Sequence, residues 1–282
     1  MKNILLPTDF SENSWNAINY AIRFFKKMPC NFYLLHVDRL SYLLTGDIPY
    51  APTDTVIEEV YTKPSKIKLR RILKDISKQF PQHKNHRFYT LTDYNLFIDS
   101  VKKTVKEYDI DFIVMGTKGA SGLDQYIMGT NTSDVITRVD CNVIAIPENA
   151  RYTKLTEIVF PTDLCLNYDI QTLQPLLDIL ETKKPSLKIL HVGQKESDLN
   201  KAQIKNKELL DKYFKNNDIT FHFLTNKNIE NGIQCFIESR PIDMICMVAK
   251  SLNYFQRILF HSKVEELSYH LDIPFLVLHE KN

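Results

Sequence analysis

The chain has 282 residues, a length that suits two domains of ordinary size, and 44% of the residues are hydrophobic and 25% charged, as in globular proteins. The 36 basic and 34 acidic residues leave a formal net charge of +2, so no overall positive field gathers nucleic acid, and we do not expect a nucleic-acid partner. We find neither a signal peptide nor an apolar run of ~20 residues, so we expect a cytoplasmic protein without a membrane partner.

Short apolar runs alternate with amphipathic segments through the first half of the chain. The runs are too short for helices and predict strands at residues 4–8, 31–37, 86–91, 113–116 and 142–146. Apolar residues at helical spacing and serine or threonine starts predict helices at residues 11–27, 65–80, 96–108 and 130–138. Residues 38–64 have no clear periodicity and predict a long loop after the second strand, and loops of this length are often functional.

The second half of the chain repeats the first. Asn-Ile-Leu-Leu-Pro-Thr-Asp-Phe at residues 3–10 returns as Glu-Ile-Val-Phe-Pro-Thr-Asp-Leu at residues 157–164. The other matched segments follow in the same order, and the second copy has predicted strands at residues 158–162, 187–192, 220–224, 244–248 and 275–278. A repeat of this period is domain-sized rather than a solenoid unit, so we predict domains at residues 1–149 and 150–282.

The order of elements predicts an α/β fold. Strands that alternate with helices form parallel sheets through right-handed crossovers, so we expect two repeated doubly wound domains, each with a five-stranded parallel sheet flanked by helices. In such sheets ligands bind at the carboxyl ends of the strands.

Glycines gather in the segment 115–131, between the fourth predicted strand and the fourth predicted helix. Four of the seven glycines in the chain lie there, namely Gly116, Gly119, Gly122 and Gly129. Glycines after a strand allow backbone conformations that side chains would obstruct, or a close approach to a ligand. Thr130 then places a hydroxyl at a helix N-terminus, where backbone N–H groups favour an anion. The segment therefore predicts a phosphate site.

The spacing of these glycines is neither that of a P-loop nor that of the G-x-G-x-x-G dinucleotide motif. It resembles the Gly-x2-Gly-x9-Gly-Ser/Thr motif of the universal stress protein family, which runs here from Gly116 to Thr130 and is complete. A first strand that ends in Pro-Thr-Asp at residues 7–9 is similar to the same family. With the repeat, the resemblance covers almost the whole chain as a tandem pair and implies the family's Rossmann-like, adenine nucleotide alpha hydrolase-like fold.

The resemblance implies a site for ATP, ADP or AMP, with Mg²⁺, in the first domain. It assigns Asp9 to the ribose hydroxyls and the backbone of Val37 to the adenine edge, while Asp9 could instead stabilise the start of a helix together with Ser11. The complete set of implied nucleotide-binding residues is Thr8, Asp9, Val37, Met115, Gly116, Gly119, Gly129, Thr130 and Asn131.

The second domain departs from this motif. Aligning Met247 with Met115 places Val248, Ser251 and His261 where the first domain has its three motif glycines, and Ser262 where it has Thr130. A β-branched and a bulky side chain would obstruct close backbone approach, so we expect weak nucleotide binding there, or none.

Neither a catalytic residue nor a metal site is predicted. His36 and His191 end matching strands without a second ligand at metal-binding spacing, so we interpret both as structural. The five cysteines lack a C-x-x-C spacing, and their odd number argues against a disulfide framework.

The leading functional hypothesis is a stress-response protein that binds nucleotide in its first domain and acts as a switch or sensor toward an unknown protein partner. The family also includes slow ATPases, so at most a slow ATP-hydrolysing enzyme is one alternative, and a nucleotide-free interaction scaffold is another. Family members pair through the last strand. Pairing of residues 143–146 with 275–278 would give an internal pseudo-dimer, and the same pairing between chains would give a homodimer.

Overall fold

The computed structural model describes residues 1–38, 54–81, 85–117, 130–167, 169–193, 195–249 and 272–280. They form two compact units: described residues up to Cys141 make up unit 1, and those from Asn142 make up unit 2. Residues 142–146 thus belong to the first sequence repeat but to the second compact unit. The domain boundary between residues 149 and 150 stays a prediction.

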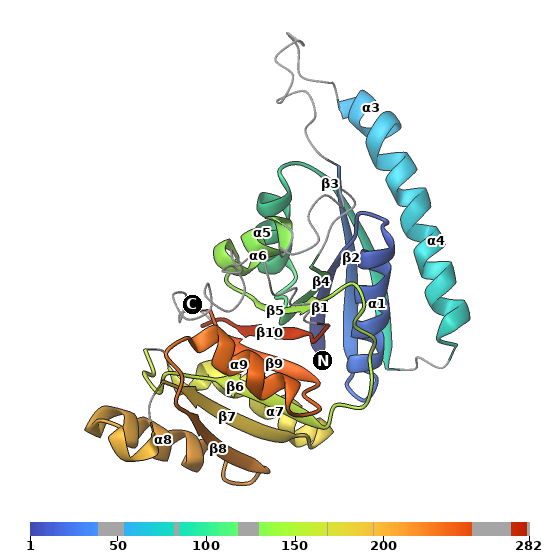
Figure 1. Ribbon diagram of the computed structural model, residues 1–282. Helices are drawn as coiled ribbons and strands as arrows, with labels where there is room; N and C mark the ends of the chain where they lie inside the picture. The colour runs from blue at the N-terminus through green and yellow to red at the C-terminus, as the bar shows by residue number, and fades with distance from the viewer. Residues whose placement is uncertain are drawn as a thin grey trace. The chain divides into compact units, whose positions relative to one another are not determined.

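Unit 1 contains a parallel sheet with the strand order β3-β2-β1-β4. Its strands are β1 (Lys2–Pro7), β2 (Cys30–Asp38), β3 (His86–Tyr94) and β4 (Phe112–Gly116). Its helical elements are α1 (Glu12–Phe24), α3 (Asp54–Val56), the π-helix η1 (Ile57–Thr62), α4 (Lys63–Gln79), α5 (Phe97–Glu107) and α6 (Thr130–Arg138). Figure 1 shows α1 and α4 on one face of this sheet and α5 and α6 on the other, as right-handed crossovers require.

One part of the core of unit 1 lies between the sheet and α1. Phe24, Phe25 and Phe32 are completely buried. The Phe25 ring packs against Phe32 and Phe112, with ring centroids 6.4 Å and 5.5 Å apart. These aromatic contacts join the C-terminal end of α1 to the first residues of β2 and β4, at the edge of the sheet opposite the carboxyl ends of the strands.

The predicted loop at residues 38–64 is wrong for its second part, because helix begins at Asp54 rather than at residue 65. Proline interrupts an α-helix because it lacks an N–H group and clashes with the carbonyl four residues earlier. Here the turn before Pro64 is a π-helix, and the Lys63 N–H donates to the Glu58 carbonyl five residues back. The wider turn lets helical structure continue through the proline. Residues 39–53 lie outside the described part of the chain.

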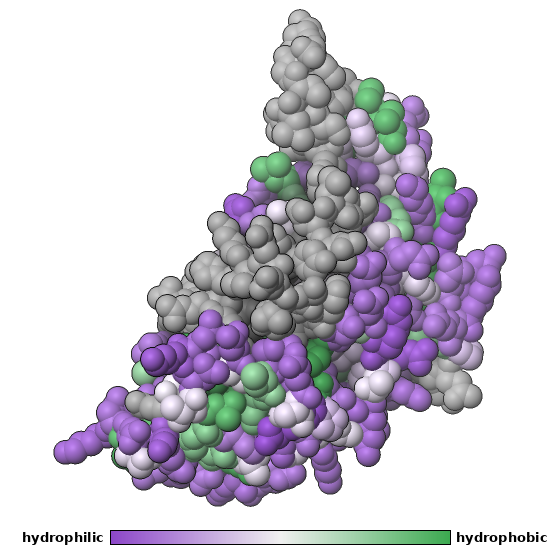
Figure 2. Space-filling view, viewed as in Figure 1, coloured by the Kyte–Doolittle hydropathy of each residue, from purple (hydrophilic) through white to green (hydrophobic). Residues whose placement is uncertain are grey.

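The outward face of this helical segment carries apolar side chains. Val56, Val60 and Ile67 are 44%, 57% and 52% exposed. Figure 2 shows apolar surface over α3 and η1.

Unit 2 contains a sheet with the strand order β5-β10-β9-β6-β7-β8. Its strands are β5 (Asn142–Ile146), β6 (Glu157–Pro161), β7 (Ser186–Val192), β8 (Ile219–Leu224), β9 (Met244–Val248) and β10 (Phe275–Leu278). Its helical elements are η2 (Ile170–Leu173), α7 (Gln174–Lys183), η3 (Glu196–Asp198), α8 (Lys201–Tyr213) and α9 (Ile229–Glu238). In Figure 1, α9 lies in front of this sheet and α7 behind it.

Strands β5 and β10 pair antiparallel within this one chain, with Phe275 opposite Ala145 and Val277 opposite Val143. The other pairs of unit 2 are parallel. The pairing joins the last strand of the first repeat to the last strand of the second, which is one of the two arrangements that the sequence left open. Both strands are buried along their length.

Candidate functional site

A tight turn follows β1 and leads into α1. Phe10 has a φ of 67°, and its N–H donates to Thr8 Oγ1 at 3.1 Å. Asp9 Oδ1 accepts from both Ser11 N (3.0 Å) and Ser11 Oγ (2.5 Å), and Ser11 Oγ accepts from Ser14 N at the start of α1. Asp9 therefore stabilises the start of α1 together with Ser11, which is the alternative that the sequence left open. Asp9 is also exposed, just after the end of β1.

The end of β2 extends beyond the end of β1. The last sheet pair between the two strands is Pro7 with Leu35, after which Thr8 N donates to the Leu35 carbonyl, whereas β2 continues to Asp38. Backbone groups of alternate residues in a strand face the same neighbour. The N–H and C=O of Val37 therefore face the side of β1, past the point where β1 turns away.

The third element of the site is the junction between β4 and α6. Thr132 Oγ1 donates to the Gly116 carbonyl at 2.8 Å, which fixes the first turn of α6 against the end of β4. Thr130 and Asn131 begin α6, and Met115 is buried in β4. Because β1 lies between β2 and β4, the predicted residues of all three strand ends lie along one edge of one sheet. Gly119 and Gly129 lie outside the described residues.

Gly116 also has a structural role. A Cβ atom at this position would lie 3.1 Å from the backbone oxygen of Asn13 in the first turn of α1. This is closer than ordinary packing allows, so a side chain here would push against helix backbone. The glycine thus allows the close approach of α1 to β4, in addition to any role toward a ligand.

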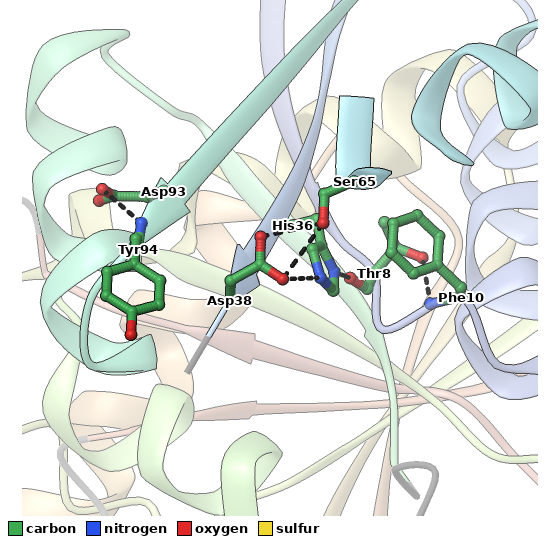
Figure 3. A network of polar contacts seen from close by, with 7 residues as sticks. All are labelled: Thr8, Phe10, His36, Asp38, Ser65, Asp93 and Tyr94. Carbon is green, nitrogen blue, oxygen red and sulfur yellow. Dashed lines mark hydrogen bonds and ion pairs between the residues drawn. The ribbon is translucent and has the colours of Figure 1, made fainter. Parts of the chain in front are cut away.

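A polar network that the sequence did not predict lies beside the turn after β1 (Figure 3). His36 Nδ1 donates to the Thr8 carbonyl at 2.7 Å, His36 Nε2 lies 3.3 Å from Asp38 Oδ1, and Ser65 Oγ donates to Asp38 Oδ2 at 2.9 Å. His36 was expected to be structural, and these contacts agree. The available signal was the spacing of His36 and Asp38, which puts both side chains on one face of β2.

The equivalent turn in unit 2 has nearly the same geometry. Leu164 has a φ of 60° and donates its N–H to Thr162 Oγ1 at 3.0 Å, and Asp163 Oδ1 accepts from Cys165 N at 2.8 Å. His191 Nδ1 contacts the Thr162 carbonyl at 3.1 Å, again a structural role. A difference between the two sites lies at the first motif glycine, Gly116, which Val248 replaces in unit 2. Val248 is buried at the end of β9, while residues 251, 261 and 262 lie outside the described part of the chain.

Within the described residues, no group of at least three His, Cys, Asp or Glu side chains is arranged to hold a metal ion. All five cysteines are free, and Cys30, Cys141 and Cys246 are buried. The described helices include none that is long and apolar enough to cross a membrane.

Comparison with known proteins finds similar sequences over about half of the chain and similar structures over nearly all of it. Residues 1–147 match the model of the universal stress protein family. A universal stress protein of Methanocaldococcus jannaschii is 23% identical over 145 residues, which are 51% of this chain and 81% of that protein. The structure of a universal stress protein from Archaeoglobus fulgidus aligns over 99% of this chain and 98% of its own, with a TM-score of 0.70 and 17% identity. A functionally unknown protein from Pseudomonas aeruginosa aligns over 99% of this chain and 92% of its own, with a TM-score of 0.62 and 10% identity.

The two structural alignments span both units, which supports the predicted α/β fold of two repeats. The predicted α/β fold is confirmed: the strands form a mostly parallel sheet with flanking helices, and the β5–β10 pair is antiparallel. The family model matches more than half of the residues of this chain, so the chain belongs to the universal stress protein family.

Proposed function

We propose that unit 1 binds an adenine nucleotide at the carboxyl ends of β1, β2 and β4, and that the protein is a nucleotide-dependent switch or sensor. The observation that carries this proposal is the Thr132–Gly116 hydrogen bond, which holds the first turn of α6 at the end of β4. A helix N-terminus offers backbone N–H groups and a favourable dipole to phosphate oxygens. Thr130 and Asn131 would contribute there, together with Gly119 and Gly129.

The neighbouring strand ends supply groups for the rest of a nucleotide. The exposed Asp9 carboxylate can accept from ribose hydroxyls, which are donors. The Val37 N–H and C=O, which face the side of β1, can pair with the edge of adenine, which has both a donor and acceptors. Thr8, Met115 and Gly116 would flank the sugar and the first phosphate. Mg²⁺ would accompany the phosphates of ATP and be held by them more than by this chain.

Unit 2 is proposed to act without nucleotide. Its strand-end turn is preserved, but a buried Val248 stands in place of Gly116. The proposal includes a cytoplasmic location and an unidentified protein partner that recognises the nucleotide-bound form. Nucleotide would favour whichever conformation of the site it binds more tightly, and the protein partner would bind that conformation.

A matched pair of variants tests the site. Asn can accept the same hydrogen bonds from Ser11 as Asp9 does, so Asp9→Asn preserves the turn while removing the charge that would bind the ribose. Calorimetric titration with ATP and Mg²⁺ should show affinity lowered about tenfold to 100-fold, the loss expected for charge-assisted hydrogen bonds. Asp163→Asn, the same change in the equivalent turn of unit 2, should leave the affinity unchanged.

The outcomes separate the rival functions. Equal effects of the two substitutions would contradict a site in unit 1, and absence of ATP binding to the unaltered protein would favour the scaffold. Phosphate release from bound ATP would favour the slow ATPase.

A further inference from the structure

Two side chains outside the predicted site connect α4 to the turn after β1. Ser65, on the first turn of α4, donates to both carboxylate oxygens of Asp38, at 3.2 Å and 2.9 Å. Asp38 contacts His36 Nε2 at 3.3 Å, and His36 Nδ1 donates to the Thr8 carbonyl at 2.7 Å. The connection thus runs from a helix, through the end of β2, to the residue that precedes Asp9 (Figure 3).

These groups are shielded from water, which strengthens the connection. Ser65 is 4% exposed, and the side chains of His36 and Asp38 are 15% and 17% exposed. Hydrogen bonds to charged groups in such surroundings hold geometry better than exposed ones do. The two ring nitrogens of His36 thus face two acceptors, the Thr8 carbonyl and the Asp38 carboxylate.

Aromatic and cationic contacts reinforce the same connection. The Phe10 ring lies against His36 with the ring centroids 4.3 Å apart, and Lys68 Nζ lies 5.1 Å from the Phe10 centroid. Ser65 and Lys68 are three residues apart on α4, so one face of its first turns reaches both β2 and the turn after β1.

Unit 2 holds its equivalent turn in another way. Gly193 stands where unit 1 has Asp38, two residues after the matching histidine, so His191 has no carboxylate at this position. Instead, two side chains of α8 reach the turn directly. Gln203 Nε2 donates to the Asp163 carbonyl at 3.0 Å, and Asn206 Nδ2 donates to the Leu164 carbonyl at 2.8 Å. The indirect connection through Asp38 therefore belongs to the unit with the complete glycine motif.

We propose that Asp38 and Ser65 are positioning residues for the nucleotide site of unit 1. Acting through His36, they hold the turn so that the Asp9 carboxylate meets the ribose hydroxyls, and they make the position of α4 part of the binding geometry. This inference rests on the proposed nucleotide binding and goes beyond it by naming residues that do not touch the ligand.

The test compares ATP with 2′,3′-dideoxy-ATP, which lacks both ribose hydroxyls. Asp38→Asn and Ser65→Ala should each lower the affinity for ATP about threefold to tenfold but change the affinity for dideoxy-ATP little, because the lost positioning acts only on the hydroxyl contact. Ser65→Thr, which keeps a hydroxyl donor, should restore most of the ATP affinity.

A second Ser–Asp pair at the end of β3 provides the control. Ser100 is completely buried, and its Oγ donates to Asp93 Oδ2 at 2.9 Å. Asp93→Asn and Ser100→Ala make the same chemical changes at the next strand end, where the Asp93 carboxylate accepts from Ser100 Oγ and from the Tyr94 N–H. Both control variants should bind ATP as the unaltered protein does. Equal losses for ATP and dideoxy-ATP in the Asp38 and Ser65 variants would overturn the proposal.

A ligand-free measurement separates failure of this inference from failure of nucleotide binding. Amide hydrogen exchange of Phe10 and Ser11, whose N–H groups close the turn, should accelerate in Asp38→Asn and Ser65→Ala but not in the two control variants. Unchanged exchange would overturn the positioning role even if ATP binds. If the unaltered protein binds no ATP, the proposed function fails, and positioning of a nucleotide site fails with it.

Discussion

The position that a Cβ atom of Gly116 would occupy lies 3.1 Å from the carbonyl oxygen of Asn13. The sequence suggested that this glycine allows a ligand to approach, and the structure gives it a second reason, the approach of α1. Copying Val248 of unit 2 into this position would therefore disturb the fold as well as the site.

Gly116→Ala should lower the free energy of unfolding of unit 1 by about 1–3 kcal/mol, because the opposing atom is helix backbone and cannot rotate away. Urea unfolding followed by circular dichroism measures this change. Asn13→Ala should not relieve it, because the contact is with the backbone. Unchanged stability of Gly116→Ala would show that α1 moves aside at little cost.

A Cβ atom on Gly232 in unit 2 would meet a side chain, whereas a Cβ atom on Gly116 would meet helix backbone. A Cβ on Gly232 in α9 would lie 2.5 Å from Val192 Cγ1. Gly232→Ala should destabilise unit 2 although alanine favours helix by ~1 kcal/mol over glycine. In a Val192→Ala background the same substitution should be neutral or stabilising. A double-mutant cycle from urea unfolding measures this coupling, and purely additive effects would contradict the predicted contact.

The fold was predictable where apolar runs are short and bounded, as at β5, β9 and β10, whose ends match the sequence prediction. The start of the helical segment α3-η1-α4 was not predictable, because Pro64 ordinarily ends or begins a helix and only the π-helical turn η1 before it lets helical structure begin at Asp54. Within the candidate site, motif spacing placed Asp9 after the first strand and Thr130 at a helix start, where the structure has them. The Asp38–Ser65 contact could not, because its two residues meet only once α4 packs on β2.

His86 should make stability depend on pH. Burial lowers the pKa of His86 below its usual 6.5, although its hydrogen bonds to the Phe25 and Met28 carbonyls act in the opposite direction. The unfolded chain then binds more protons than the folded chain below about pH 6.5, so acidification through this range lowers the free energy of unfolding. His86→Gln should reduce that fall. Urea unfolding at about pH 5 and about pH 7.5 compares the two proteins, and identical pH dependence would contradict the assignment.

The cysteines should differ in reactivity toward a thiol-alkylating reagent. Burial raises the pKa of Cys30 to about 12 and also raises that of the completely buried Cys246, whereas Cys165 and Cys235 are exposed. Alkylation of the folded protein, read by peptide mass spectrometry, should therefore modify Cys165 and Cys235 first.

Cys165 provides an internal check on the electrostatics. Partial burial, and secondly the nearby Asp163 carboxylate, raise the pKa of this thiol. Asp163→Asn should therefore speed its alkylation while leaving the rate at Cys235 unchanged. An unchanged rate at Cys165 would mean that the carboxylate does not act on the thiol.

The central claim is a single adenine-nucleotide site in unit 1, and the stoichiometry of binding tests it most directly. Calorimetric titration of the full chain with ATP and Mg²⁺ should saturate at about one nucleotide per chain, because the two units share the strand-end turn but only unit 1 has the complete glycine motif. No binding heat would contradict the site itself. Saturation at about two nucleotides per chain would contradict the role assigned to Val248 and show that unit 2 binds as well.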